Sequence, residues 1–165
     1  MRTIICTLYE GDYHYGVAAL VNSLYNHGYR GVVCIGFRGK LPTWASSARR
    51  KKLGAWEEVF VNPIIDGLEL HFYALTTKYH LTNYKPNFML DLIERSNYPM
   101  DSIFYIDPDI CITETWKFFE EWLSCGIAVC EDINSPYSKN HPRRQGWRRY
   151  FNERGLNLRF RLSEY

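Results

Sequence analysis

Near its start the chain reads Arg2-Thr3-Ile4-Ile5-Cys6-Thr7-Leu8 (RTIICTL), a run of apolar and β-branched residues. Such a run is typical of a strand that is buried on both faces. Apolar residues then recur with helical spacing between Val17 and Leu24, and a second buried run, GVVCIGF, follows at 31–37. The order strand, helix, strand predicts two parallel strands joined by a right-handed crossover.

Strands and helices alternate along the rest of the chain as well. The first helix should end near Gly28, and Pro86 suits the first turn of a helix that ends before Asn97. The apolar face of that second helix would carry Phe88, Met89, Leu92 and Ile93. The other expected elements are a polar, helix-compatible segment at 43–53, a helix at 114–123, and strands at 58–61, 68–75, 102–106 and 127–130. This alternation predicts an α/β fold with an open, mainly parallel sheet and helices on both faces.

The composition is that of a globular chain. With 165 residues, 46% of them hydrophobic, we expect a single domain that buries about two thirds of its unfolded surface. Residues 1–132 would form its core and 133–165 a basic, aromatic C-terminal segment. The five cysteines are odd in number and lack a CxxC pair, which predicts buried thiols in a reducing compartment. We see neither a signal peptide nor an apolar membrane span, so we expect a cytoplasmic protein, with peripheral membrane attachment left open.

The stretch Phe104–Ile112 (FYIDPDICI) places two carboxylates directly after a buried run. In an extended chain, Asp107 and Asp109 point to the same side, and Pro108 would hold the pair extended. Carboxylate oxygens on a stiff backbone favour Mg²⁺ or Mn²⁺, and ligands of open α/β sheets bind beyond the carboxyl ends of strands. We therefore predict a metal site here. The alternative is a solvated turn, because Asp and Pro are common in turns.

Two further features point to the same edge of the sheet. Lys85 precedes Pro86 and would face the positive end of a helix dipole unless an anion lay nearby, so it is a candidate phosphate ligand; a side chain extended to solvent is the alternative. The loop after the first strand, at 7–13, offers Tyr13 for stacking on a base and backbone groups near Leu8. Ordinary loop packing, with Asp12 as a helix cap, is the alternative there.

Together these elements resemble the GT-A fold glycosyltransferases that use nucleotide-diphosphate sugars, in particular the glycogenin and bacterial lipopolysaccharide galactosyltransferase group. The likeness rests on Thr7-Leu8 after the first strand, Ser23-Leu24 at the end of the first helix, Lys85 before the acidic strand, and the YxDxD pattern of Tyr105, Asp107 and Asp109. It covers Arg2 to about Asp132. The acceptor-side strands of such enzymes, and the His that often adds a metal ligand, have no counterpart in this sequence.

The resemblance implies a transferase that moves a sugar from a nucleotide-diphosphate donor, with UDP-sugar favoured, to a glycan, lipid or protein acceptor. It implies Mn²⁺ or Mg²⁺ bound by Asp109 directly and by Asp107, which also contacts ribose. Tyr13 would stack on uracil. Glu10 departs from the family, which often has a neutral polar residue there. The expected donor contacts are Thr7, Leu8, Glu10, Tyr13, Lys85 and Asp107.

Two other functions remain open. A haloacid-dehalogenase-type phosphatase also uses DxD after an apolar strand, its first Asp being the nucleophile; that motif usually lies on the first strand, and Cys111 stands where Thr or Val is usual. A non-enzymatic nucleotide or nucleic-acid binding module is the other.

The segment 139–161 is basic with interleaved rings. It is compatible with a solvated face, an anionic membrane surface or nucleic acid, of which nucleic acid is the least favoured.

The general base of such a transfer is undecided. Glu131 and Asp132 are candidates, with a structural role as the alternative. The five histidines show no HExxH or paired spacing, so zinc is unsupported, and of the five only His80, close to Lys85, merits attention.

Overall fold

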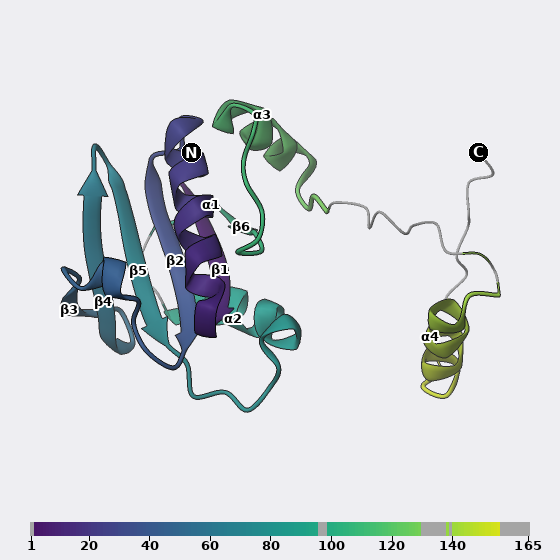
Figure 1. Ribbon diagram of the computed structural model, residues 1–165. Coiled ribbons are helices and arrows are strands. Elements are labelled where there is room, and N and C mark those ends of the chain that lie inside the picture. The colour runs from purple at the N-terminus through teal and green to yellow at the C-terminus, as the bar shows by residue number, and fades with distance from the viewer. Residues whose placement is uncertain (1, 96–98, 130–137, 139, 156–165) are drawn as a thin grey trace. The chain divides into compact units, whose positions relative to one another are not determined.

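A computed structural model describes residues 2–95, 99–129, 138 and 140–155 (Figure 1). The chain divides into two compact units, Met1–Gly126 and Ile127–Tyr165.

The first unit is built on a six-stranded mixed sheet with the order β3-β4-β5-β2-β1-β6. Strand β1 (Thr3–Glu10) pairs in parallel with β2 (Gly31–Arg38) and with β6 (Ser102–Tyr105), and β2 pairs in parallel with β5 (Leu68–Ala74). Strand β4 (Trp56–Ile65) joins β5 antiparallel, and β3 (Arg49–Leu53) joins β4 antiparallel. The predicted mainly parallel sheet is therefore confirmed, with an antiparallel extension at one edge.

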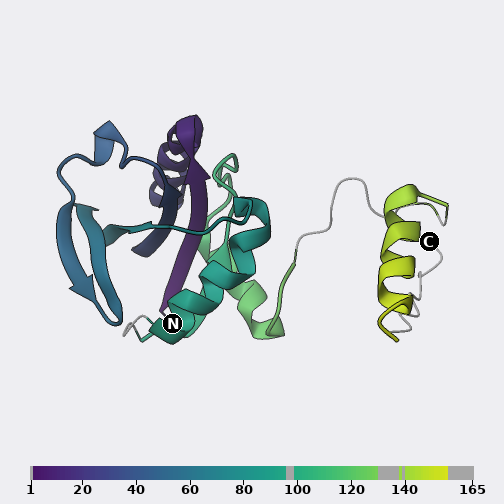
Figure 2. The same ribbon diagram turned by 90° about the horizontal axis from the view of Figure 1, so that it is seen from below.

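Helices cover both faces of this sheet (Figures 1 and 2). Helix α1 (His14–Asn26) and helix α3 (Trp116–Glu121) pack on one face, and α2 (Leu81–Arg95) packs on the other. Side chains of a strand alternate between faces, so Ile5 and Tyr9 of β1 join the core under α1 while Ile4 and Leu8 join the core under α2. The α/β class with helices on both faces is thus confirmed. This architecture is common to Rossmann-like folds and is not specific to the GT-A family.

The segment 43–53 differs from the helix-compatible expectation. It forms a short 3₁₀ helix, η2 (Thr43–Ala45), followed by strand β3, whose residues Arg49–Leu53 pair with β4. Strand pairing overrides the weak helical preference of these residues. Four consecutive cations, at 49–52, are exposed on this edge strand, and such charges disfavour pairing with another sheet edge.

Helix α2 begins five residues earlier than predicted, at Leu81, so Pro86 lies in its second turn. Pro86 cannot donate to the carbonyl of Thr82, which removes one helical hydrogen bond. Burial of Phe88 and Leu92 beneath the helix offsets this loss. Ile93, which was expected on the buried face, is instead half-exposed.

The last part of the first unit also departs from expectation. Helix α3 covers 116–121 and continues as a 3₁₀ helix, η3 (Trp122–Cys125), rather than one helix over 114–123. No strand forms over 127–129, the described part of the expected last strand, where Ile127 and Val129 are almost fully exposed. Cys130 lies outside the described residues. Cys6 and Cys34 are buried as expected, but Cys111 is exposed.

Candidate functional site

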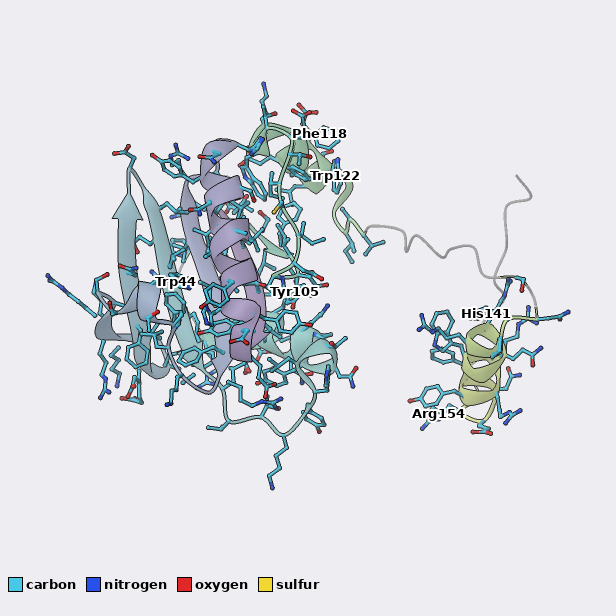
Figure 3. The ribbon with its side chains drawn as sticks, viewed as in Figure 1. Trp44, Tyr105, Phe118, Trp122, His141 and Arg154 are labelled. Carbon is cyan, nitrogen blue, oxygen red and sulfur yellow. The ribbon has the colours of Figure 1, made fainter. Side chains whose placement is uncertain are left out.

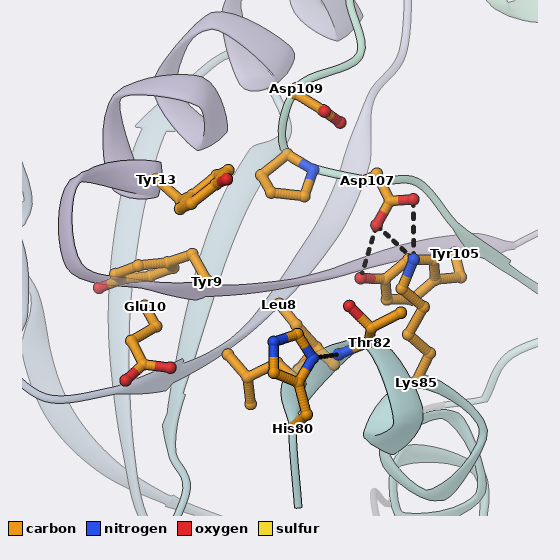
Figure 4. Close-up of a pocket in the computed structure, with 12 residues that line it drawn as sticks. Leu8, Tyr9, Glu10, Tyr13, His80, Thr82, Lys85, Tyr105, Asp107 and Asp109 are labelled. Carbon is orange, nitrogen blue, oxygen red and sulfur yellow. Dashed lines mark hydrogen bonds and ion pairs between the residues drawn. The ribbon is translucent and has the colours of Figure 1, made fainter.

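A cleft of about 420 Å³ opens where strands β1 and β6 end and helix α2 begins (Figure 4). The strand order turns at β1, because β2 lies on one side of it and β6 on the other. Ligands of open α/β sheets bind at this switch point, beyond the carboxyl ends of the strands. Six of the seven residues expected to contact donor or metal line the cleft: Leu8, Glu10, Tyr13, Lys85, Asp107 and Asp109.

The Asp-Pro-Asp segment is a turn and not the extended stretch that was predicted. The backbone N–H of Ile110 donates to the carbonyl of Asp107 at 3.1 Å, and Pro108 and Asp109 are the turn's central residues. Proline is favoured at the second position of such turns because its φ is already set. Both carboxylates nevertheless line the same cleft, so the turn presents two acids to one space.

Asp107 is held by a cation and a phenol. The ammonium of Lys85 lies 2.6 Å from Oδ1 and 2.8 Å from Oδ2 of this carboxylate, and the hydroxyl of Tyr105 donates to Oδ1 at 3.2 Å. Lys85 also lies 4.9 Å from the ring centre of Tyr105. Burial, followed by the charge of Asp107, raises the pKa of Tyr105 above its usual value, so its hydroxyl keeps its proton and acts as a donor.

Asp109 is different. No dashed line reaches it in Figure 4, and within the part of the chain that the structure describes its carboxylate has no hydrogen-bonding or ionic partner. One acid of the pair is therefore neutralised by Lys85 and the other faces the cleft as a free anion. The sequence predicted the charges but not this asymmetry.

Helix α1 holds the turn in place through two contacts. A Cβ on Gly16 would lie 2.4 Å from the carbonyl oxygen of Pro108, so only a glycine allows the turn to approach the helix so closely. Farther along α1, the hydroxyl of Ser23 accepts a hydrogen bond from the backbone N–H of Ile112 at 2.9 Å. Helix α1 thus anchors the segment after strand β6 at two points, at Gly16 and at Ser23.

Two tyrosines, one near the end of β1 and one at the end of the 3₁₀ helix that follows, form one wall of the cleft. Tyr9 is buried and stacks on Phe37 with ring centres 5.8 Å apart. Tyr13, from the 3₁₀ helix η1 (Gly11–Tyr13), is 64% exposed and stands at the cleft, and among the described residues no ring stacks on it. Tyr13 therefore offers an open aromatic face.

Glu10 reaches the cleft but is already engaged. Arg38, its neighbour on β2, forms an ion pair with it and also donates to the carbonyls of Thr77 and Tyr79. The hydrogen bond from Arg38 lowers the pKa of Glu10 and raises that of the arginine. This network ties the loop before α2 to the ends of β1 and β2, so Glu10 has a structural role as well as a place at the cleft.

Thr7 does not line the cleft. Its side chain is fully buried on the α1 side of β1, and its hydroxyl has no hydrogen-bond partner among the described residues. Leu8, next in the strand, points to the other face, so the contact expected of the pair falls to Leu8 alone.

His80 lines the cleft at the start of α2, where its Nδ1 accepts from the N–H of Thr82 at 3.3 Å. The sequence singled out His80 without giving it a role. It gave no reason to include Thr82, because the helix was expected to start later; a polar residue at the true first turn is the signal that would have found it.

The acidic pair suits a cation that arrives with phosphate. Two carboxylates are hard oxygen ligands, but no group of three or more His, Cys, Asp or Glu gathers within the described ranges. Mg²⁺ is usually bound by one or two carboxylates, with substrate phosphates and water completing its shell. The donor set fits that arrangement and does not fit an all-protein cage.

The second unit contains helix α4 (Pro142–Asn152), which the sequence did not predict. His141 caps it by accepting from the N–H of Arg143, and Arg154 stacks over the ring of Tyr150 near its end (Figure 3). Arg148, Arg149 and Tyr150 are exposed. Glu131 and Asp132, the candidate bases, lie outside the described residues.

Neither a scan against protein-family models nor a search of curated protein sequences found a match for this chain. Among the described residues, no helix is long and apolar enough to cross a membrane.

Proposed function

We propose that this chain is the donor-binding part of a metal-dependent glycosyltransferase that uses a nucleotide-diphosphate sugar, most readily a UDP-sugar. The observation that carries the proposal is the cleft at the switch point, which gathers two carboxylates, a lysine and an open aromatic ring. A nucleotide diphosphate offers matching groups: its phosphates would contact Lys85 and a metal ion held by the carboxylates, and its planar base would stack on Tyr13.

Each residue has a role that follows from its position. Asp109 presents a free carboxylate and is the first metal ligand, and Asp107 is the second. Tyr13 stacks on the base, and Leu8, near the end of β1, also lines the cleft. Lys85, on α2, supplies a positive charge to the phosphates because its flexible stem lets the ammonium follow an anion.

The chemistry needs stabilisation of a charged leaving group. Sugar transfer expels a nucleoside diphosphate, so negative charge grows on the phosphate nearest the sugar. A bound Mn²⁺ or Mg²⁺ supplies Lewis-acid stabilisation of that charge. Lys85, whose ammonium lies beside Asp107, adds a second positive centre, and Tyr105 keeps Asp107 oriented through its hydroxyl.

The test is thermal unfolding of the chain with UDP, with Mn²⁺ and with both. We expect the melting temperature to rise clearly only with both, and the rise to disappear in Asp109→Ala. ADP, GDP and CDP with Mn²⁺ report on the base. No shift with any nucleoside diphosphate and metal would remove the basis for the proposal.

The helix α4 favours an additional contact with an anionic surface. Its exposed arginines and Tyr150 suit the headgroup region of a membrane, where basic residues meet anionic lipid and rings lie at the interface. Such a surface would bring the enzyme to a lipid-linked acceptor.

A further inference from the structure

The side chain of Lys85 occupies the carboxylate that a metal would need. Its ammonium contacts both oxygens of Asp107, at 2.6 and 2.8 Å. It therefore takes the position of a metal ion that this carboxylate would bind through both oxygens. The pair is partly shielded, since the side chain of Lys85 is only 26% exposed. In the absence of ligand, the cation bound to Asp107 is therefore the protein's own Lys85.

A divalent ion meets two obstacles at this site. Asp109 is the only carboxylate of the pair that is free, so a lone ion finds one ready protein ligand. The ammonium of Lys85 also repels the ion, because like charges within a few ångströms of each other interact strongly at a partly buried site. Metal alone should therefore bind weakly.

A diphosphate removes both obstacles together. Phosphate oxygens accept hydrogen bonds from an ammonium as readily as a carboxylate does, so Lys85 can move from Asp107 to the phosphate by rotating its stem. This movement frees Asp107 for the metal, while the phosphates supply the further oxygen ligands that the two carboxylates lack.

We propose that Lys85 is an internal counter-cation that excludes free divalent ions from Asp107 and makes metal and diphosphate bind cooperatively. The inference rests on the proposed function and goes beyond it, because it concerns how the site avoids metal in the absence of donor. Linkage requires the effect to be mutual: Mn²⁺ raises the affinity for UDP by the same factor as UDP raises the affinity for Mn²⁺.

The experiment measures three affinities on the full chain: Mn²⁺ alone, UDP alone, and Mn²⁺ in the presence of saturating UDP. Calorimetry reports all three without any catalytic assay, and the electron paramagnetic resonance of free Mn²⁺ reports the two Mn²⁺ affinities independently. In the wild type we expect UDP to tighten Mn²⁺ binding by about tenfold or more, within the usual range of coupling between sites.

Replacing Lys85 should change these values in a specific pattern. In Lys85→Met, Mn²⁺ alone should bind about tenfold more tightly, UDP alone more weakly, and the coupling factor should fall towards one. Lys85→Gln gives an independent variant if the first does not fold. Asp107→Asn added to either should cancel the gain in Mn²⁺ affinity, because it removes the carboxylate that was freed.

Lys117→Met is the matched control, since it removes one exposed lysine far from the cleft. Lys117 lies on α3, whose first backbone N–H bonds the carbonyl of His27 at the far end of α1. Its three affinities should equal those of the wild type.

The outcomes separate the inference from the proposed function. If the wild type binds Mn²⁺ with UDP but neither Lys85 variant tightens Mn²⁺ binding, the counter-cation role is wrong and the proposed function stands. If neither the wild type nor any variant binds Mn²⁺ or UDP, both are wrong.

Discussion

A methyl group on Gly16 would lie 2.4 Å from the carbonyl oxygen of Pro108. Helix α1 and the Asp-Pro-Asp turn therefore touch through backbone atoms, and the position of both carboxylates depends on the absence of a side chain at one helical residue.

Gly16→Ala should destabilise the protein by about 1–3 kcal/mol, because either the turn or the helix must move to admit the new methyl. Urea unfolding measures the loss. Gly146→Ala is the control, since its Cβ would meet nothing within 4 Å in helix α4 and alanine is the better helix former. If both variants behave alike, the close approach at Gly16 is not needed for the fold.

Tyr13 and Tyr15 form a matched pair of exposed rings two residues apart at the start of α1. Only Tyr13 lines the cleft, while Tyr15 packs against His14 with ring centres 4.1 Å apart. Tyr13→Ala should weaken UDP–Mn²⁺ binding by about 1–3 kcal/mol, the usual contribution of one stacked base, and Tyr15→Ala should leave it unchanged. Equal effects of the two changes, measured by calorimetry, would place the base elsewhere.

Asp107 and Asp109 should differ in their effect on stability although both are expected metal ligands. Asp107→Asn loses the ion pair with Lys85, and because its side chain is 44% exposed the cost should be only about 0.2–1 kcal/mol. Asp109→Asn loses no partner within the described residues and should leave the free energy of unfolding unchanged. A clear loss of stability in Asp109→Asn would indicate a structural role for this acid instead.

Much of the fold could be predicted because hydrophobic periodicity is a local signal. The buried run at 3–8 and the helical spacing after it gave the central strand and α1 directly. The edge strand β3 was missed because its residues are charged and its pairing with β4 is a tertiary property. Helix α2 starts before Pro86, which is a first-turn signal in the sequence, because the packing of Phe88 and Leu92 outweighs one missing hydrogen bond.

The candidate site was predictable in its residues and not in its geometry. The order of elements placed Leu8, Lys85 and the acids at one edge of the sheet, and the structure brings them to one cleft. Sequence could not reveal that Lys85 contacts Asp107, because the two are 22 residues apart and meet only through the packing of α2 beside β6. Nor could it reveal that Glu10 is engaged by Arg38, a partner set by strand register.

Because His71 is buried, we expect the free energy of unfolding to fall at acidic pH. This histidine is buried in β5, and desolvation lowers its pKa below the usual 6.5 even though Glu69, 2.9 Å away, favours the charged form. The unfolded chain then binds more protons than the folded one below pH 6.5, so stability is fully present above that pH and falls as the pH drops towards the folded-state pKa.

Urea unfolding at about pH 5, 6, 7 and 8, which spans the usual pKa range of histidine, measures this fall. His71→Gln should flatten the profile, and Glu69→Gln should steepen it, because removing the carboxylate lowers the pKa of His71 further. A profile that is unaffected by either change would contradict the assignment.

The arginines of α4 should bind anionic membranes in a salt-dependent manner. Arg148 and Arg149 are exposed, and each basic residue near an anionic bilayer contributes about 1 kcal/mol. Arg148→Gln with Arg149→Gln should therefore weaken binding of the full chain to anionic vesicles by about 2 kcal/mol, roughly thirtyfold in affinity. Flotation of the chain with the vesicles measures this loss. Binding to neutral phosphatidylcholine vesicles should be weak for every variant.

Arg49→Gln with Lys51→Gln is the control for net charge, because it removes two exposed cations from strand β3 instead. This control should bind vesicles like the wild type. RNA in a filter-binding assay across salt concentrations tests the alternative of a nucleic-acid module: tight, salt-sensitive RNA binding that survives Asp107→Ala and Asp109→Ala, together with no preference for anionic vesicles, would favour that alternative, since nucleic-acid binding depends on phosphate neutralisation by basic residues and not on the acidic pair.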